Sequence, residues 1–133
     1  MMKRSLISVL SLLMLVLCIP ALAESTDWNY DANYAILRGY DGAGGDVVVP
    51  AEIDGFTVDV IGINVFKGDT ITSLTLPETV LELRSNAVAS CEKLTSVTLP
   101  QSLVVINRMN FFSCNALSEV TIPASVRYIG DTS

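Results

Sequence analysis

The feature that most constrains this chain is a period of 23 residues, marked by Pro77, Pro100 and Pro123. Apolar residues recur in the same phase around each proline, and so many positions do not stay in phase by chance. They are Ile71, Leu94 and Leu117; Leu74, Val97 and Val120; Leu76, Leu99 and Ile122; Val80, Leu103 and Val126; Leu83, Ile106 and Ile129; and Cys91 with Cys114. A unit this short cannot bury its own apolar face, so the period predicts a solenoid of stacked coils.

Each coil begins with an L-x-x-V-x-L-P stretch, which places one apolar stripe inward and leaves the x positions outward. In the middle coil we expect Leu94, Val97 and Leu99 to point inward. A second short extended piece around Val104–Ile106 is expected to cover the other side. The predicted fold is therefore a mainly β solenoid with short strands and turns, and with little helix outside the first residues.

The stretch before these coils is less regular. Pro50 precedes Pro77 by 27 residues, and the extra residues fall around 51–56, where a turn is expected. We predict an N-terminal capping unit with a first irregular repeat over residues 24–70. Repeats over 71–133 follow, the last of them incomplete. The aromatic residues of the capping unit are expected to close the apolar end of the solenoid, with stacking on sugar rings as the alternative. They are Trp28, Tyr30, Tyr34 and Tyr40.

The first 23 residues have the pattern of a secretory signal peptide. Lys3 and Arg4 precede an apolar run that ends at Ile19, and the small-residue pattern Ala21-Leu22-Ala23 follows. The run is short for a membrane-spanning helix, which needs about 20 apolar residues. We predict cleavage after Ala23, export, and no membrane span in the mature chain.

Charge and composition exclude several classes of function. Of 8 basic and 14 acidic residues, the signal peptide holds Lys3 and Arg4, which leaves the mature chain a net charge of −8. An acidic chain is repelled by nucleic acids and by anionic membranes. The chain has no histidine, the commonest general base and zinc ligand. We expect no enzyme activity, no catalytic or metal site and no cofactor.

The middle coil resembles the BspA-type leucine-rich repeat, approximately L-x-x-I-x-L-P-x-x-V-x-x-I-G-x-x-A-F-x-x-C. The likeness lies in Leu94–Pro100 and in Leu103, Ile106, Phe111 and Cys114. This resemblance implies a leucine-rich-repeat solenoid in a secreted or cell-surface bacterial protein that serves protein–protein or adhesion contacts. The alternative function is an accessory carbohydrate- or substrate-binding portion of a larger secreted enzyme.

Departures from that pattern affect single coils. Val88 stands where phenylalanine is usual, and Arg84 and Asn107 replace the glycine. Met109–Asn110 occupies a position where alanine is common. We expect these changes to alter packing locally and to leave the fold intact.

The outward positions of the L-x-x-V-x-L stretches form the candidate binding face, where hydroxyl side chains should stack in rows. The rows are Thr75, Thr98 and Thr121; Thr72, Thr95 and Ser118; and Ser73, Ser96 and Glu119. Such a face suits an extracellular protein or a glycan as partner. The alternative is that threonine and serine simply fit exposed strand positions and pair across strands.

Two further features leave alternatives open. Cys91 and Cys114 occupy the same position of successive coils, and they either pack as thiols or form a disulfide. The last coil stops at Ser133 shortly after Ile129-Gly130. We expect either a longer repeat protein or an exposed end that associates with another chain end to end. The acidic, glycine-rich stretch Asp41–Asp46 could suggest a calcium loop, but it lacks the ligand spacing of one. We expect it to be a turn before the Val47–Val49 strand.

Overall fold

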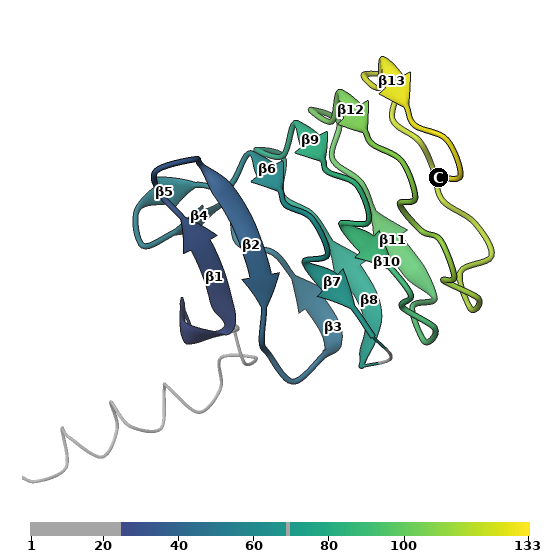
Figure 1. The fold of residues 1–133 in the computed structure, drawn as a ribbon, viewed down its shortest axis with the longest axis horizontal. Coiled ribbons are helices and arrows are strands. Elements are labelled where there is room, and N and C mark those ends of the chain that lie inside the picture. The colour runs from purple at the N-terminus through teal and green to yellow at the C-terminus, as the bar shows by residue number, and fades with distance from the viewer. Residues whose placement is uncertain (1–24, 69) are drawn as a thin grey trace, which may run out of the picture.

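The computed structural model describes residues 25–68 and 70–133, which form a mainly β solenoid (Figure 1). Its coils stack side by side from the teal to the yellow part of the chain, and each contributes short strands to sheets that run along the solenoid. The only helix in the described ranges is the short η1 (Ser25–Asp27). The predicted fold is confirmed, whereas the predicted signal peptide lies outside the described residues.

One wall of the solenoid is a three-stranded parallel sheet in the order β11-β8-β3. Its strands are β3 (Gly45–Val48), β8 (Ile71–Thr75) and β11 (Ser96–Thr98). We call this the β3-β8-β11 sheet. Strands β8 and β11 fall in the L-x-x-V-x-L stretches, and β3 falls in the looser stretch before Pro50. Their alternation of inward and outward side chains follows from the pleat.

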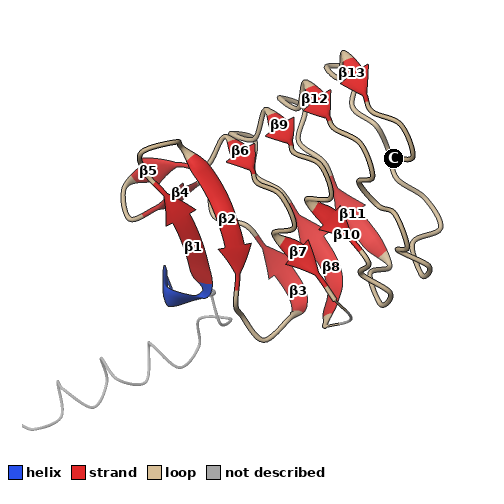
Figure 2. Ribbon diagram, viewed as in Figure 1, coloured by secondary structure: helices blue, strands red, loops and turns tan. Residues whose placement is uncertain are grey.

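The other walls consist of shorter strands, which appear in Figure 2 as red arrows joined by tan loops. One sheet has the order β1-β2-β6-β9-β12-β13, and β10 pairs with β7 in another. Their bounds are β1 (Trp28–Asp31), β2 (Ile36–Tyr40), β6 (Val60–Ile61), β7 (Phe66–Lys67), β9 (Glu82–Leu83), β10 (Val88–Ala89), β12 (Val105–Ile106) and β13 (Tyr128–Ile129). The expected extended piece around Val104–Ile106 is thus confirmed as β12.

Two antiparallel hairpins interrupt the parallel pattern near the N-terminus. Strands β1 and β2 pair with each other, so that a hairpin begins the six-stranded sheet. Strand β4 (Glu52–Ile53) pairs with β5 (Phe56–Thr57) through Asp54 and Gly55, whose φ angles are 52° and 83°. Positive φ at both central residues suits a two-residue hairpin. This hairpin confirms the expected turn and accounts for the longer spacing from Pro50 to Pro77.

The core is a set of ladders, in which equivalent side chains of successive coils stack inside the solenoid. Leu37, Ile61, Leu83 and Ile106 share one register and are at most 1% exposed. Burial of such side chains contributes roughly 1.5–3 kcal/mol each. Since these ladders hold the fold together, the outward side chains of the strands are free for other roles.

The last coil departs from the expected strand pattern. No strand forms over 117–123, so the prediction that the third L-x-x-V-x-L stretch is a strand is wrong. Ile122 is 43% and Ile129 is 51% exposed, although their equivalents Leu99 and Ile106 are buried. Each inner coil is covered on both sides, whereas this coil has a neighbour on one side only within the described residues. Its apolar residues consequently stay half-exposed.

Candidate functional site

The outward surface of β8 and β11 is covered with small hydroxyl side chains. Thr72, Thr95, Ser96 and Thr98 are exposed, while Ser73 and Thr75 are half-buried. Ser96 lies opposite Ser73 and Thr98 opposite Thr75, so the expected rows do form across these two strands. Short side chains in register make this surface flat, with hydroxyl groups that can donate and accept hydrogen bonds.

The hydroxyl groups of this face also bond within the sheet. The Thr95 hydroxyl donates to the carbonyl oxygen of Thr72 at 3.0 Å. The hydroxyls of Ser73 and Thr72 donate to Oδ1 of Asp46, at 2.7 and 3.2 Å. Part of the expected pairing across strands is therefore present, and it holds the Asp46 carboxylate in place.

Strand β3 extends these rows by two residues that lie outside the predicted rows. Asp46 lies opposite Ser73, and Val48 lies opposite Thr75 with its side chain 63% exposed. The stretch Asp41–Asp46 was expected to be a turn, but β3 already begins at Gly45. Asp46 precedes Pro50 by the same four residues that separate Ser73 from Pro77, and this spacing was the available signal.

The third coil continues the face without a strand. Ser118, Glu119 and Thr121 are all exposed, and no backbone hydrogen bond links this stretch to β11. Beside it lies a hollow of about 310 Å³ at the end of the solenoid. Its lining includes Ser118 and Glu119 together with apolar side chains of the last coil. The candidate face therefore consists of a paired part, on β3, β8 and β11, and an unpaired part over 118–121.

Cys91 and Cys114 are free thiols stacked inside the solenoid. The Sγ atom of Cys91 lies 3.4 Å from the carbonyl oxygen of Phe66. A hydrogen bond from Cys91 lowers the pKa of Cys114 to about 7, against the opposing effect of burial. The same bond and burial raise the pKa of Cys91. Cys114 lines the hollow at the end of the solenoid, whereas Cys91 is fully buried.

The aromatic residues of the N-terminal unit divide into two groups. Trp28 is 6% exposed and packs against Tyr40 and Phe66, with ring centroids 4.7 and 6.4 Å away. This group closes the apolar end, as expected. Tyr30 stacks instead on the half-exposed Phe56, with centroids 6.1 Å apart, and Tyr34 is 68% exposed. Among the described residues, no ring contact joins Tyr34 to the Tyr30–Phe56 pair.

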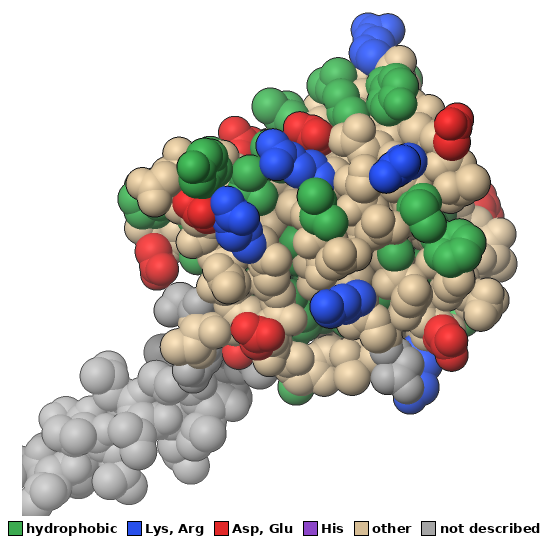
Figure 3. Space-filling view, in the orientation of Figure 1, with side chains coloured by type: hydrophobic (Ala, Val, Ile, Leu, Met, Phe, Trp, Pro, Cys, Tyr) green, Lys and Arg blue, Asp and Glu red, His purple; other side chains and the backbone are tan. Residues whose placement is uncertain are grey.

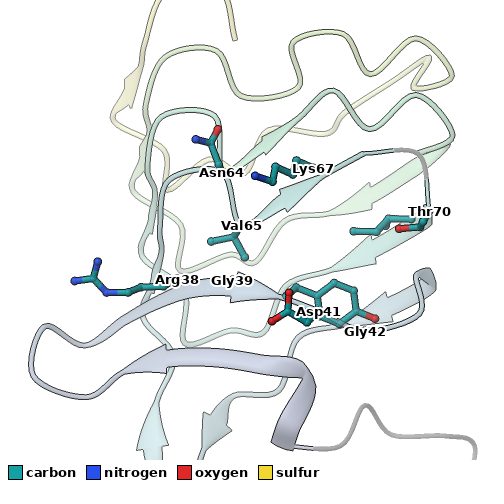
Figure 4. A pocket seen from close by; sticks show the side chains of 10 residues that line it. Arg38, Gly39, Asp41, Gly42, Asn64, Val65, Lys67 and Thr70 are labelled. Atoms are coloured by element: carbon teal, nitrogen blue, oxygen red, sulfur yellow. The ribbon is translucent and has the colours of Figure 1, made fainter.

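A second hollow, of about 260 Å³, lies between β2 and the loop after β7 (Figure 4). Figure 4 shows Arg38 extending away from Asn64 and Lys67. Its guanidinium group pairs instead with Asp31, with Nε 2.7 Å from Oδ2, and lies 5.5 Å from the ring centroid of Tyr34. The polar groups of this hollow do not converge on one point, as a ligand site requires.

Charges are distributed unevenly over the solenoid. Basic side chains are spread over the face in view in Figure 3. None lies on β3, β8 or β11, because the stretches 39–66, 68–83, 94–107 and 109–126 contain no lysine or arginine. Within the described part of the chain, no three histidine, cysteine or carboxylate side chains gather as a metal site, and no helix is suited to crossing a membrane.

Comparisons with known proteins agree with this geometry. The family model described as "BspA type Leucine rich repeat region" matches residues 52–133 in six copies. A search of curated proteins found no match. Among solved structures, the chain is similar to the T. pallidum leucine-rich repeat protein TpLRR, with 29% identity and a TM-score of 0.71. That match covers 77% of this chain and 50% of TpLRR.

Two leucine-rich repeat proteins from Bacteroides species are also similar. The protein from Bacteroides capillosus is 34% identical with a TM-score of 0.66, over 76% of this chain and 80% of that protein. The one from Bacteroides ovatus is 27% identical with a TM-score of 0.62, over 77% of this chain and 29% of that protein. The chain thus spans half or less of two of the three proteins.

Proposed function

Because the chain belongs to the BspA-type leucine-rich repeat family, we propose that it is a secreted or cell-surface module that binds a protein partner in adhesion, without catalysis. The observation that carries this proposal is the flat hydroxyl face of the β3-β8-β11 sheet. Its side chains lie outside the core ladders, so they are available for contact. A leucine-rich repeat fold suits a protein-binding role, since stacked repeats present an extended surface.

The partner is proposed to be extracellular. The basic start, apolar run and small-residue end of residues 1–23 support export. Family membership supports a bacterial surface or secreted location.

A substitution that blocks the face without changing its charge tests this proposal. Thr75 and Thr98 are neighbours across β8 and β11, and tyrosine is well tolerated in strands. The double variant Thr75→Tyr/Thr98→Tyr should fold normally and lose binding to whichever extracellular-matrix protein or glycan the unmodified chain binds in an array. Gln101→Tyr, an exposed position after Pro100, is the matched control and should bind normally. Full binding by the double variant would contradict the proposed face.

A further inference from the structure

We propose that the face of the β3-β8-β11 sheet takes a cationic, extended polypeptide segment laid across its strands. This inference rests on the proposed function and names the chemistry of its partner. The face is an unpartnered sheet surface, and the argument for its occupant is charge complementarity. Two carboxylates, Asp46 and Glu119, lie at equivalent positions four residues before Pro50 and Pro123.

The Asp46 carboxylate is oriented by the sheet itself. Oδ1 accepts hydrogen bonds from the hydroxyls of Ser73 and Thr72. Side-chain entropy is a main cost of exposed ion pairs, and these two bonds reduce it before a ligand arrives. Oδ2 has no hydrogen-bond partner among the described residues, which leaves it available to a lysine or arginine of the partner.

The described strands of the face carry no cation of their own. The strands β3, β8 and β11 and the stretch 117–123 contain no lysine or arginine. The ion pairs of Arg38 with Asp31 and of Arg84 with Glu82 involve none of these strands. The potential over the face is therefore negative, which attracts a basic segment and repels a sulfated or sialylated glycan.

The spacing of the carboxylates defines the segment. Asp46 lies opposite Ser73 and Ser73 opposite Ser96, and Glu119 holds the equivalent position one coil further on. The stretch 118–121 is not hydrogen-bonded to β11, so the strand spacing gives only the scale of this separation. Three such spacings amount to about 14 Å, which equals about four residues of an extended chain. Side chains four residues apart in such a chain point to the same side. Two basic residues separated by three others can thus reach both carboxylates, while the residues between them lie over the hydroxyl rows.

Binding of short synthetic peptides to the chain lacking residues 1–23, measured by calorimetry at low salt, tests this inference. The probe is a threonine–valine peptide with two lysines four positions apart. Control peptides carry the lysines three positions apart, on opposite sides, or carry glutamates instead. Heparin represents the anionic glycans. We expect the first peptide to bind best, its affinity to fall with added salt, and the glutamate peptide and heparin not to bind.

Variants that neutralise carboxylates separate the contribution of this face to peptide binding from that of the overall negative charge of the chain. Asp46→Asn/Glu119→Gln should weaken binding of the probe about tenfold, and asparagine can still accept from Ser73 and Thr72. Glu52→Gln/Asp54→Asn removes the same charge from the exposed β4–β5 hairpin and should change affinity by less than about twofold. Equal weakening by both variants, no weakening by either, or preferred binding of heparin would overturn the inference.

The Thr75→Tyr/Thr98→Tyr variant distinguishes failure of the cationic-segment inference from failure of the proposed function. That variant can lose binding to the protein found in the array while the two lysine peptides and the glutamate peptide bind the unmodified chain equally. In that case the face binds a protein of other chemistry, and only the cationic segment is refuted. If the variant keeps its array partner, the face is not the binding surface, and both proposals fall.

Discussion

The side-chain oxygen Oδ1 of Asn110 accepts a hydrogen bond from the backbone N–H of Val88 at 3.2 Å, inside the solenoid. One coil earlier the equivalent link is made by backbone alone, since Phe66 N–H donates to the carbonyl oxygen of Ala87 at 2.9 Å. Asn110 is fully buried and is the only buried polar side chain of the described core. It thus replaces a backbone acceptor where the third coil departs from the regular path.

The remaining hydrogen-bonding groups of Asn110 are also satisfied. Its Nδ2 donates to the carbonyl oxygens of Asn107 and Arg84, at 2.7 and 3.0 Å. Replacement by alanine leaves the Val88 N–H without an acceptor and removes one of two donors from each carbonyl, since Arg84 still accepts from the Ala87 N–H and Asn107 from the Ser133 hydroxyl. Each unsatisfied buried group costs about 1–3 kcal/mol.

We therefore predict that Asn110→Ala lowers the free energy of unfolding by about 2–4 kcal/mol in urea denaturation. Asn115→Ala, at an exposed position of the same coil, is the control and should cost less than about 0.5 kcal/mol. An unchanged stability of Asn110→Ala would mean that the coil relaxes to the backbone path of the coil containing Ala87.

Met109 adopts a left-handed backbone conformation, which is unfavourable for a residue with a large side chain. Its φ is 61°, and the equivalent residues of the two preceding coils, Asn64 and Asn86, have φ of 55° and 57°. Asparagine tolerates this region better than other residues with a Cβ. Met109→Asn should therefore raise the free energy of unfolding by about 0.5–1 kcal/mol, measured by thermal and urea melts. The reciprocal Asn86→Met should lower it, and a stabilising Asn86→Met would refute this explanation.

Gly62 permits close approach of the N-terminal hairpin to the first irregular repeat. A Cβ on Gly62 would lie 2.6 Å from the carbonyl oxygen of Leu37, to which the Gly62 N–H donates at 2.8 Å. Gly62→Ala should cost about 1–3 kcal/mol, because that backbone must move. Gly39→Ala is the control, since its Cβ would meet only the Cβ of Asn29 at an ordinary 3.5 Å. Similar stability of the two variants would contradict the proposed contact.

The cysteine pair predicts a pH-dependent reactivity. Since the Cys91 thiol lowers the pKa of Cys114 to about 7, the thiolate of Cys114 forms as the pH rises through 7. Alkylation by iodoacetamide should therefore modify Cys114 first, at a rate that rises through that pH, because the thiolate is the nucleophile. Peptide mapping by mass spectrometry gives the site and the rate.

The variant Cys91→Ala removes the hydrogen bond that lowers the pKa of Cys114. The midpoint of alkylation should then move to higher pH, towards the ordinary value for a thiol. Modification of Cys91 before Cys114, or an unmoved midpoint in Cys91→Ala, would contradict the assignment of the hydrogen bond.

Repetition made most of the fold predictable. Alignment on Pro77 and Pro100 predicts the inward ladders and the pairing of Ser96 with Ser73, because residues 23 apart occupy the same position of successive coils. The Asp54-Gly55 pair likewise predicts a turn from local backbone preference alone. These features depend on one coil or on its immediate neighbour.

Features that depend on exceptions to the repeat escaped prediction. The role of Asn110 requires knowing that the next residue, Phe111, leaves the regular path, because its φ is 63° whereas its equivalents Val88 and Phe66 have no positive φ. The missing strand over 117–123 has no signal in its own sequence, which matches the earlier coils. The acidic and glycine-rich composition of Asp41–Asp46 predicts a turn, although the spacing of Asp46 from Pro50 places it in the row of Ser73.

The threonine methyl groups offer the most direct test of the central claim, that the β3-β8-β11 face binds the partner. Methyl-labelled threonine resolves this face from the rest of the surface by nuclear magnetic resonance. Thr72, Thr75, Thr95 and Thr98 lie on the paired part of the face. Off it lie Thr26, Thr57, Thr79 and Thr132.

The spectrum is recorded while the chain lacking residues 1–23 is titrated with the array protein that it binds. The first group of methyl signals should shift or broaden in proportion to bound partner, and the second group should not. Perturbation confined to the second group, with the signals of Thr75 and Thr98 unmoved at saturation, would contradict the account.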